Sequence, residues 1–538
     1  MTEAARRVSW WSVALALLVA CAGTEPVPEE SAPALETVVA HPRLEGLADQ
    51  IESSLDDWQM PGLAVAVSVG NELVFAEGFG VKQVGRDERN DSATLFQIGS
   101  VTKGFGATAI GLLVDDGLVT FDDPALQHLP WLELSDPELT RRMTLRDLLS
   151  HRSGIAEDAY PAMGLLDARA VAERARYLDN TADYGAFRYS NLGYGLLGLV
   201  VEEATGLSWS QFVQERLFDP LEMTSSAATP FGVWDADYVA PAFLGTAPAG
   251  PVSLDDAPDL NVALPHGIDR EGERRVLPWQ SYDNMQAAGS VVSNVRDMSR
   301  WLRLHLGVLG ADDVLTEETR RELHRAQVDA PSSSIFYDAV EGGAPYAMGW
   351  HTQTFAGREV LSHGGGIFGF PAYAAFLPEL EAGVVVLANG STWTPYYPHQ
   401  EIVAQVFARL LDLPARDWHA ETLEATAALQ TRVDEALAGF DAQRDETTPP
   451  SGSAESYAGR YSSEHAGALE VRVADDELLL AFEGHGSFSG TLMPWNGETF
   501  RLYFDGGDGQ AYSSALVTFV PDEQGLVLDL GRFGRYLR

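Results

Sequence analysis

Lysine and cysteine are almost absent from this chain of 538 residues. It holds two lysines, Lys82 and Lys103, beside 34 arginines, a bias typical of a GC-rich genome, so chemistry that needs a lysine amine has two candidates. A single cysteine, Cys21, excludes an internal disulfide and any cysteine-rich metal site. No apolar run reaches the roughly 18 residues of a membrane-spanning helix, which excludes a protein with several such helices.

Positive charge is also scarce, because 36 Lys and Arg residues stand against 78 Asp and Glu residues, a formal net charge of −42. Such a surface repels phosphate backbones, so we expect no nucleic-acid partner. The rest of the composition, 45% hydrophobic and 21% charged, is that of a globular protein, and the length predicts more than one domain.

Residues 1–20 predict a signal peptide for export. Arg6 and Arg7 precede the apolar stretch Val8–Ala20, which suits a signal sequence and is too short to span a bilayer. The segment Leu18–Cys21 resembles a bacterial lipobox, in which the cysteine is lipidated; the alternative is an ordinary signal peptide with a chance cysteine. We expect a lipoprotein of the bacterial cell envelope, in the outer membrane facing the periplasm, whose lipid anchor is its only contact with the membrane.

Local patterns predict the elements that follow. Apolar spacing predicts a helix over His41–Trp58 and another over Ser100–Asp116, and alternation around Gly70-Asn71 predicts a β-hairpin over 62–81. The second helix contains Gly104, Gly106 and Gly111, which weaken it, so close packing has to compensate. From 124 to 304 the pattern is mostly helical.

After the mostly helical stretch, the C-terminal part of the chain shows mainly strand patterns, with one helical linker between them. Strand patterns return between 347 and 387, and a helical linker covers Ala420–Arg444. From residue 457 short alternating runs separated by turn residues predict a small sandwich or barrel. The predicted organisation is a signal peptide (1–20), a flexible tether (21–40), a main domain (41–415), a helical linker (416–453) and a C-terminal β domain (454–538).

The candidate catalytic residues of the sequence include Lys103 and a serine close to it. No Gly-x-Ser-x-Gly, His-Glu-x-x-His or P-loop pattern occurs, so we expect neither a metal nor a cofactor. Ser100 and Lys103 lie one helical turn apart, so the amine can reach the hydroxyl. A helix N-terminus favours a developing oxyanion, and a buried lysine can act as a base. The alternative is a helix-capping serine with a surface lysine.

Two further segments carry suitable polar groups. Tyr189 and Asn191 precede an apolar helical pattern and present a phenol and an amide from one loop. His363 is followed by three glycines at an expected strand end, where small residues let a ligand approach the backbone: Gly364, Gly365 and Gly366.

Together and in this order, these segments resemble the serine β-lactamase and penicillin-binding-protein superfamily, in its class-C-like branch. Flanking segments resemble the same branch: Leu148–Ile155, Ala287–Asn294 and Val384–Asn389. The resemblance implies an α/β (α+β) fold, with an antiparallel sheet flanked by helices and a mostly helical subdomain. The C-terminal unit resembles the small β domain often appended to such hydrolases.

The resemblance also implies roles for these residues. Ser100 would be the acylated nucleophile, and Lys103 with Tyr189 would form the base network. Asn191 would hold Lys103 and the substrate amide. The backbone N–H groups of Ser100 and Gly366 would form the oxyanion hole.

One position departs from the β-lactamase pattern. His363 stands where β-lactamases carry the lysine of Lys-Thr-Gly, and Gly364 stands at the threonine. A histidine is mostly neutral at pH 7 and holds a substrate carboxylate less firmly. The histidine therefore favours an esterase or D-peptide hydrolase activity over a β-lactamase activity. We interpret His151, in Leu148–Ile155, as a buried residue that fixes a loop.

The expected function is an exported serine hydrolase that acts through a Ser100 acyl-enzyme on a small-molecule or peptide substrate. Esterase, D-peptide hydrolase, DD-peptidase and weak β-lactamase activities all remain open. A different class also remains open, a penicillin-binding sensor lipoprotein that is acylated without turnover.

We predict that Cys21 carries the lipid anchor. Mass spectrometry of protein extracted from membranes of the native host should find a lipidated cysteine as the N-terminal residue. A product cleaved elsewhere, with Cys21 free or removed, would contradict this prediction.

Overall fold

The computed structural model describes residues 35–538 except for a set of internal segments. Those segments are 156–165, 179–183, 235–238, 241–252, 257–259, 269–272, 311–313, 332–343, 368, 392–396, 446, 465–466, 475–476, 484–488, 505–513, 524 and 531–534. The predictions for the signal peptide, for Cys21 and for most of the tether lie outside the described residues. None of the described helices is long and apolar enough to cross a membrane.

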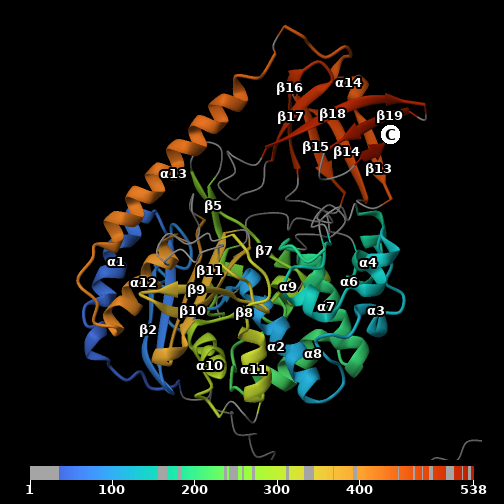
Figure 1. Cartoon of the computed structure of the whole chain (residues 1–538). Coiled ribbons are helices and arrows are strands. Elements are labelled where there is room, and N and C mark those ends of the chain that lie inside the picture. Colours follow the sequence, from blue (N-terminus) through green and yellow to red (C-terminus); the bar gives the residue numbers. More distant parts are fainter. Residues whose placement is uncertain are drawn as a thin grey trace, which may run out of the picture. The chain divides into compact units, whose positions relative to one another are not determined.

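A six-stranded antiparallel sheet is the framework of the main domain (Figure 1). In spatial order its strands are β2 (Glu72–Gly80), β1 (Gly62–Val69), β12 (Ala382–Ala388), β11 (Phe370–Leu377), β10 (Arg358–Ile367) and β9 (His351–Phe355). Leu63 of β1 pairs with Ala388 of β12, so segments far apart in sequence meet at the centre of the sheet. The central strands are rich in Val and Ala and buried on both faces, as expected of a sheet covered on two sides.

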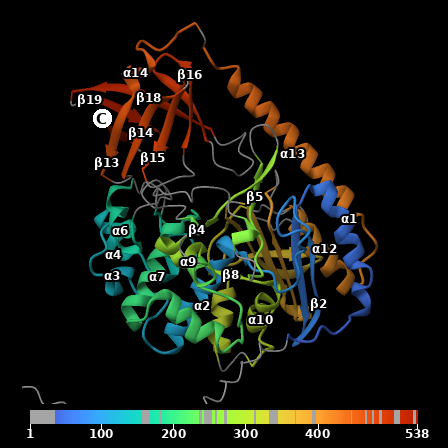
Figure 2. The same ribbon diagram turned by 180° about the vertical axis from the view of Figure 1, so that it is seen from behind.

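Two helices cover one face of this sheet (Figures 1 and 2): α1 (Leu47–Trp58) and α12 (Tyr397–Leu410). Buried Ile51 and Phe407 belong to the apolar cluster on this face. The long helix α13 (Trp418–Asp441) follows, and Trp418 at its start packs in the same cluster. The predicted helix over His41–Trp58 is therefore confirmed, although residues 42–44 form a separate short turn.

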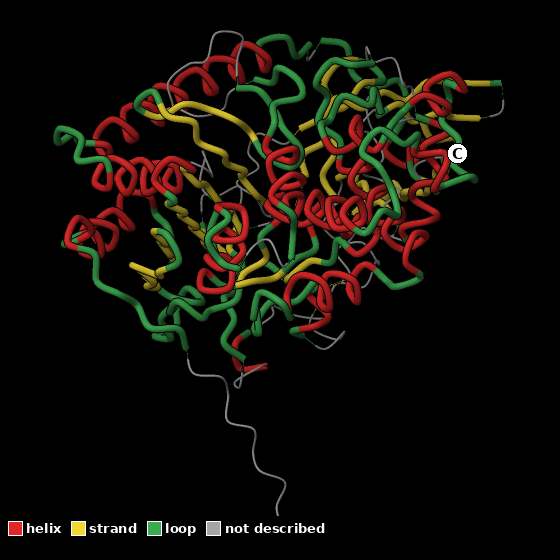
Figure 3. The backbone as a smooth tube through the Cα atoms, turned by 60° about the horizontal axis from the view of Figure 1, so that its bottom comes forward, coloured by secondary structure: helices red, strands yellow, loops and turns green. Residues whose placement is uncertain are grey.

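The other face carries the helix-rich part of the domain, where short helices pack against one another (red in Figure 3). These helices are α2 (Thr102–Asp115), α3 (Ala125–His128), α4 (Pro137–Arg142), α5 (Leu145–Leu149), α6 (Ala168–Glu173), α7 (Asn191–Thr205), α8 (Trp209–Val213), α9 (Gln286–Gly289), α10 (Val295–Leu306) and α11 (Glu317–His324). Paired short strands interrupt them: β3 (Phe96–Gln97) with β8 (Val292–Ser293), β4 (Val239–Ala240) with β7 (Trp279–Gln280), and β5 (His266–Ile268) with β6 (Arg274–Val276).

Helix α2 is the centre of this part, and close packing compensates for its glycines, as the sequence predicts. A Cβ atom on Gly104 would lie 2.5 Å from the Trp301 ring, and one on Gly111 would lie 2.9 Å from Thr319. Trp301 in turn stacks on Phe105, with 4.3 Å between ring centroids. The glycines thus let large aromatic rings pack directly against the backbone of the helix that carries Lys103.

The C-terminal β domain is a closed barrel, which decides between the two predicted architectures. Its strands are β13 (Gly459–Ser463), β14 (Gly467–Ala474), β15 (Glu477–Phe482), β16 (Ser489–Asn496), β17 (Thr499–Phe504), β18 (Ser514–Asp522), β19 (Gly525–Asp529) and β20 (Arg535–Leu537), preceded by α14 (Ala454–Tyr457). Inward side chains such as Tyr461, Leu480 and Leu502 are fully buried and form its core. The alternating runs that predict this domain lie at 468–473, 478–482, 499–504, 516–520 and 525–530 and correspond to β14, β15, β17, β18 and β19. The sequence patterns missed β13, β16 and β20.

We predict opposite effects for two Gly→Ala substitutions in helices. Gly104→Ala should lower the free energy of unfolding by about 1–3 kcal/mol, because the added methyl group overlaps the Trp301 ring. Gly439→Ala, in the exposed part of α13 with no neighbouring atom within 4 Å of its Cβ, should raise it by about 0.5–1 kcal/mol through helix propensity. Urea unfolding of the three proteins measures both. Equal stability of Gly104→Ala and the wild type would contradict the packing argument.

Candidate active site

Ser100 and Lys103 lie together at the start of α2. Residues Gly99–Val101 form a 3₁₀ turn that leads directly into the helix. The Lys103 Nζ atom lies 3.0 Å from the Ser100 Oγ atom. Ser100 makes no capping hydrogen bond at the helix start, and Lys103 is fully buried. The alternative of a capping serine with a surface lysine is therefore wrong.

Three oxygen atoms surround the buried amine of Lys103. Besides the Ser100 hydroxyl, it donates to Asn191 Oδ1 at 2.6 Å and to the backbone carbonyl of Ala288 at 3.0 Å. The amine also lies over two aromatic rings, 4.7 Å from the centroid of Tyr189 and 5.5 Å from that of Tyr194. A buried amine is stable only when its hydrogens are satisfied, and here polar partners and ring faces provide this.

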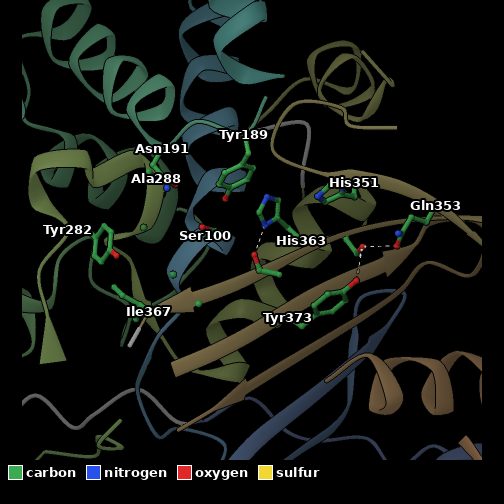
Figure 4. A pocket seen from close by; sticks show the side chains of 15 residues that line it. Ser100, Tyr189, Asn191, Tyr282, Ala288, His351, Gln353, His363, Ile367 and Tyr373 are labelled. Atoms are coloured by element: carbon green, nitrogen blue, oxygen red, sulfur yellow. Dashed lines mark hydrogen bonds between the residues drawn. The ribbon is translucent and has the colours of Figure 1, made fainter. Parts of the chain in front are cut away.

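Tyr189 and Asn191 lie where the chain enters α7, as predicted. Ser190 between them caps the helix, because its Oγ accepts from the Gly193 N–H at 3.1 Å. This cap directs the Asn191 side chain toward Lys103 and leaves Tyr189 half-buried at the cavity wall. In Figure 4 the hydroxyl end of Tyr189 points toward Ser100.

Strand β10 forms the opposite wall. The predicted strand end at His363–Gly366 is confirmed, because these residues form the last part of β10, which pairs with β11 and ends at Ile367. The glycines bring the strand close to the Ser100 turn. A Cβ on Gly365 would lie 2.0 Å from the Ile98 carbonyl oxygen, and one on Gly99 would lie 2.6 Å from the Gly366 nitrogen. Gly99 also has a φ of +50°, which favours glycine.

His363 is a buried, neutral ring held by the protein on both nitrogens. Its Nδ1 lies 2.6 Å from the carbonyl oxygen of Gly364, and its Nε2 lies 3.1 Å from the Tyr346 hydroxyl. An Nδ1–H donor and an Nε2 acceptor satisfy both contacts. Burial, together with the positive charge of Lys103, holds the pKa of His363 well below its usual value. The ring therefore offers a substrate no positive charge at neutral pH.

These residues line one cavity of about 330 Å³ (Figure 4). Its described lining comprises Gly99, Ser100, Tyr189, Asn191, Tyr282, Ala288, Gly289, His351, Gln353, Ser362, His363, Gly364, Gly366, Ile367 and Tyr373. None of these lining residues is Asp, Glu, Lys or Arg. Burial lowers the pKa of His351 to about 4, so that ring is neutral as well. The described wall is therefore polar without being charged.

Several lining residues were not predicted from the sequence. Tyr373 donates to the Ser362 hydroxyl at 3.1 Å, and that hydroxyl lies 3.5 Å from Gln353 Oε1. His351 reaches the cavity from the first residue of β9. These side chains come together through the pairing of β9, β10 and β11, and no short motif marks them. The only available signal was their position in strands adjacent to the His363 segment.

The sheet, the helix-rich part and the Ser100–Lys103 pair define a serine hydrolase of the β-lactamase and penicillin-binding-protein type. The Beta-lactamase family matches residues 47–408, and the chain belongs to that family. Residues 443–533 match a second family, described as a Domain of unknown function (DUF3471).

The chain is similar to curated proteins that are named as a hydrolase and as a penicillin-binding protein. It is 29% identical to "Unguisins hydrolase ungD'" of Aspergillus campestris over 68% of this chain and 65% of that one, just under two thirds of its length. It is 27% identical to Penicillin-binding protein 4 of Amycolatopsis lactamdurans over 65% of this chain and 86% of that one. The structure of an octameric penicillin-binding protein homologue from Pyrococcus abyssi matches with a TM-score of 0.57 and 22% identity, covering 92% and 100% of the two chains, which is a likeness of fold.

Proposed function

We propose that this serine hydrolase cleaves an uncharged ester or amide through an acyl-enzyme on Ser100. The observation that carries the proposal is the 3.0 Å contact between the buried Lys103 Nζ and the Ser100 Oγ. A serine hydroxyl becomes a useful nucleophile only when a base within hydrogen-bond reach removes its proton.

The partners of Lys103 support its role as that base. The ammonium form donates to Ser100 Oγ, Asn191 Oδ1 and the Ala288 carbonyl oxygen. To act as a base it first loses the proton that faces Ser100. The contacts with Asn191 and Ala288 are kept in the neutral amine, so its lone pair faces the Ser100 hydroxyl. The hydroxyl proton then passes to Nζ as Oγ attacks the substrate carbonyl carbon.

The backbone around Ser100 supports stabilisation of the resulting oxyanion. As the Oγ–C bond forms, the carbonyl π electrons move to oxygen, and the N–H groups of Ser100 and Gly366 donate to it. Gly99 and Gly365 permit this arrangement, because a side chain on either would separate β10 from the Ser100 turn. The leaving group departs with a proton relayed from Lys103 through Tyr189. Water then attacks the acyl-enzyme and releases the acid.

The uncharged wall supports an uncharged substrate. A substrate carboxylate would lose its hydration on entering the cavity and would find no described cationic partner in the wall. The relative from Aspergillus campestris is named as a hydrolase, which supports turnover over a sensor role. Esters, blocked amides and peptides without a nearby free carboxylate are therefore the proposed substrate class.

We predict that Ser100 is the only serine labelled by a fluorophosphonate probe, and that Ser100→Ala abolishes both labelling and turnover. A panel of p-nitrophenyl esters, D-alanyl peptides and nitrocefin measures turnover. Labelling without turnover would favour the sensor alternative. Full activity of Ser100→Ala would overturn the proposed function.

We predict that His363→Lys shifts substrate preference toward carboxylates. A charge-assisted contact contributes roughly 1.5–3 kcal/mol against roughly 0.5–1.5 kcal/mol for a neutral hydrogen bond. The ratio of kcat/KM for p-nitrophenyl hemisuccinate to that for p-nitrophenyl acetate should therefore rise roughly tenfold. Because the threonine hydroxyl is also missing at Gly364, a single change recovers part of the preference of a β-lactamase.

His363→Gln is the matched control, since it changes the side chain without adding charge and should leave that ratio unchanged. A wild-type protein that hydrolyses carboxylated β-lactams as fast as simple esters would contradict the role given to His363.

A further inference from the structure

His151 lies behind the catalytic cavity, in the turn that follows α5, and contacts the chain on both sides of Tyr189. Its backbone carbonyl accepts from the Arg188 N–H at 2.6 Å. Its Nδ1 accepts from the Ser190 N–H at 3.1 Å. The residues immediately before and after Tyr189 are therefore both bonded to one buried histidine.

The ring of His151 also contacts the Tyr189 ring directly. Their centroids lie 4.3 Å apart at an interplanar angle of 35°. Tyr194 and Tyr346 pack against the same imidazole at 5.1 and 4.9 Å. The Tyr194 hydroxyl donates to the Leu149 carbonyl at 2.7 Å, which joins α7 to the end of α5 beside His151. Tyr189 thus packs against the His151 imidazole, and Tyr194 and Tyr346 fix the position of that imidazole.

Two features of His151 are unfavourable in themselves. His151 has a φ of +57°, a conformation that costs a side-chain-bearing residue energy and that glycine or asparagine adopts more easily. Its Nδ1 accepts, so the proton resides on Nε2, which has no hydrogen-bond partner among the described residues. A histidine is therefore present at this position although its backbone is strained and its Nε2–H is unsatisfied. The hydrogen bond from the Ser190 N–H to Nδ1 is the contact that accounts for it.

We propose that His151 is a positioning residue that holds the Tyr189 phenol against Ser100 and Lys103 by binding both neighbours of Tyr189 and stacking on its ring. The proposal rests on the proposed function for the use of Tyr189 in proton transfer. This role requires a neutral imidazole, because a proton on Nδ1 would remove the acceptor for the Ser190 N–H. Burial, with the nearby charge of Lys103, holds the pKa of His151 well below its usual value and meets this requirement.

The test compares three variants. His151→Leu removes the acceptor and the polar ring. His151→Asn places an amide oxygen close to the position of Nδ1 and suits the positive φ. His399→Leu removes another buried histidine, which lies on α12 and contacts the carbonyl of Pro371 on β11 through its Nε2, and controls for a general loss of stability.

We expect His151→Leu to lower kcat by about 100-fold with KM changed less than about threefold, because proton transfer, and not binding, is impaired. His151→Asn should recover at least about tenfold of that loss. His399→Leu should retain the kcat of the wild type. Equal losses in the leucine and asparagine variants would overturn the proposal.

A double-mutant cycle shows whether His151 acts through Tyr189. In a Tyr189→Phe background, where the phenol is already gone, His151→Leu should lower kcat by less than about threefold. A full 100-fold further loss would overturn the proposal. Failure of the proposed function is seen separately, as full activity of Ser100→Ala.

Hydrogen exchange tests the same contacts without any substrate. The Ser190 amide should exchange faster in His151→Leu than in the wild type, because its acceptor Nδ1 is gone, and it should regain protection in His151→Asn. The Arg188 amide bonds to the backbone carbonyl, which all variants keep, and serves as the internal reference. Unchanged exchange of the Ser190 amide in His151→Leu would overturn the proposal, whatever the protein hydrolyses.

Discussion

The buried amine of Lys103 is the constraint on which the rest of the site depends. A lysine removed from water needs partners for its hydrogens, and three separate segments supply them: the Ser100 turn, the start of α7 at Asn191 and the carbonyl of Ala288. Meeting this one requirement brings together elements nearly 190 residues apart in sequence. The same contacts that make the amine tolerable inside the protein also place it beside the nucleophile.

The second constraint is close packing against the backbone at several glycines, where a side chain would not fit. Gly365 lies against the Ile98 carbonyl, Gly99 against Gly366, and Gly104 against the Trp301 ring. The first two contacts bring β10 against the turn that carries Ser100, and the third brings an aromatic ring against the backbone of α2. Helix propensity is lost at Gly104, and aromatic packing offsets it. The helix that carries Lys103 is therefore fixed by tertiary packing and not by its own sequence preference.

The parts of the site that could be predicted from the sequence are those whose residues lie close together in the chain. Spacing alone predicts that Ser100 lies beside Lys103 and that Tyr189 lies beside Asn191. That the two pairs meet was implied only by the family resemblance. The cavity wall at Gln353 and Tyr373 depends on strand register, which no local pattern specifies. In the barrel, β16 was missed because Gly490 and a register shift after Pro494 interrupt its alternation, and β20 because it has three residues.

Surface and cavity act in the same direction on anionic substrates. A net charge of −42 lowers the concentration of anions near the protein, and the described cavity wall offers them no cation once they enter. The two contributions differ in range. Salt screens the surface field over roughly 10 Å at 0.1 M, whereas the cost of desolvating a carboxylate inside the cavity is little affected by salt. Discrimination that persists at high ionic strength therefore originates in the wall around His363, and discrimination that disappears originates in the acidic surface.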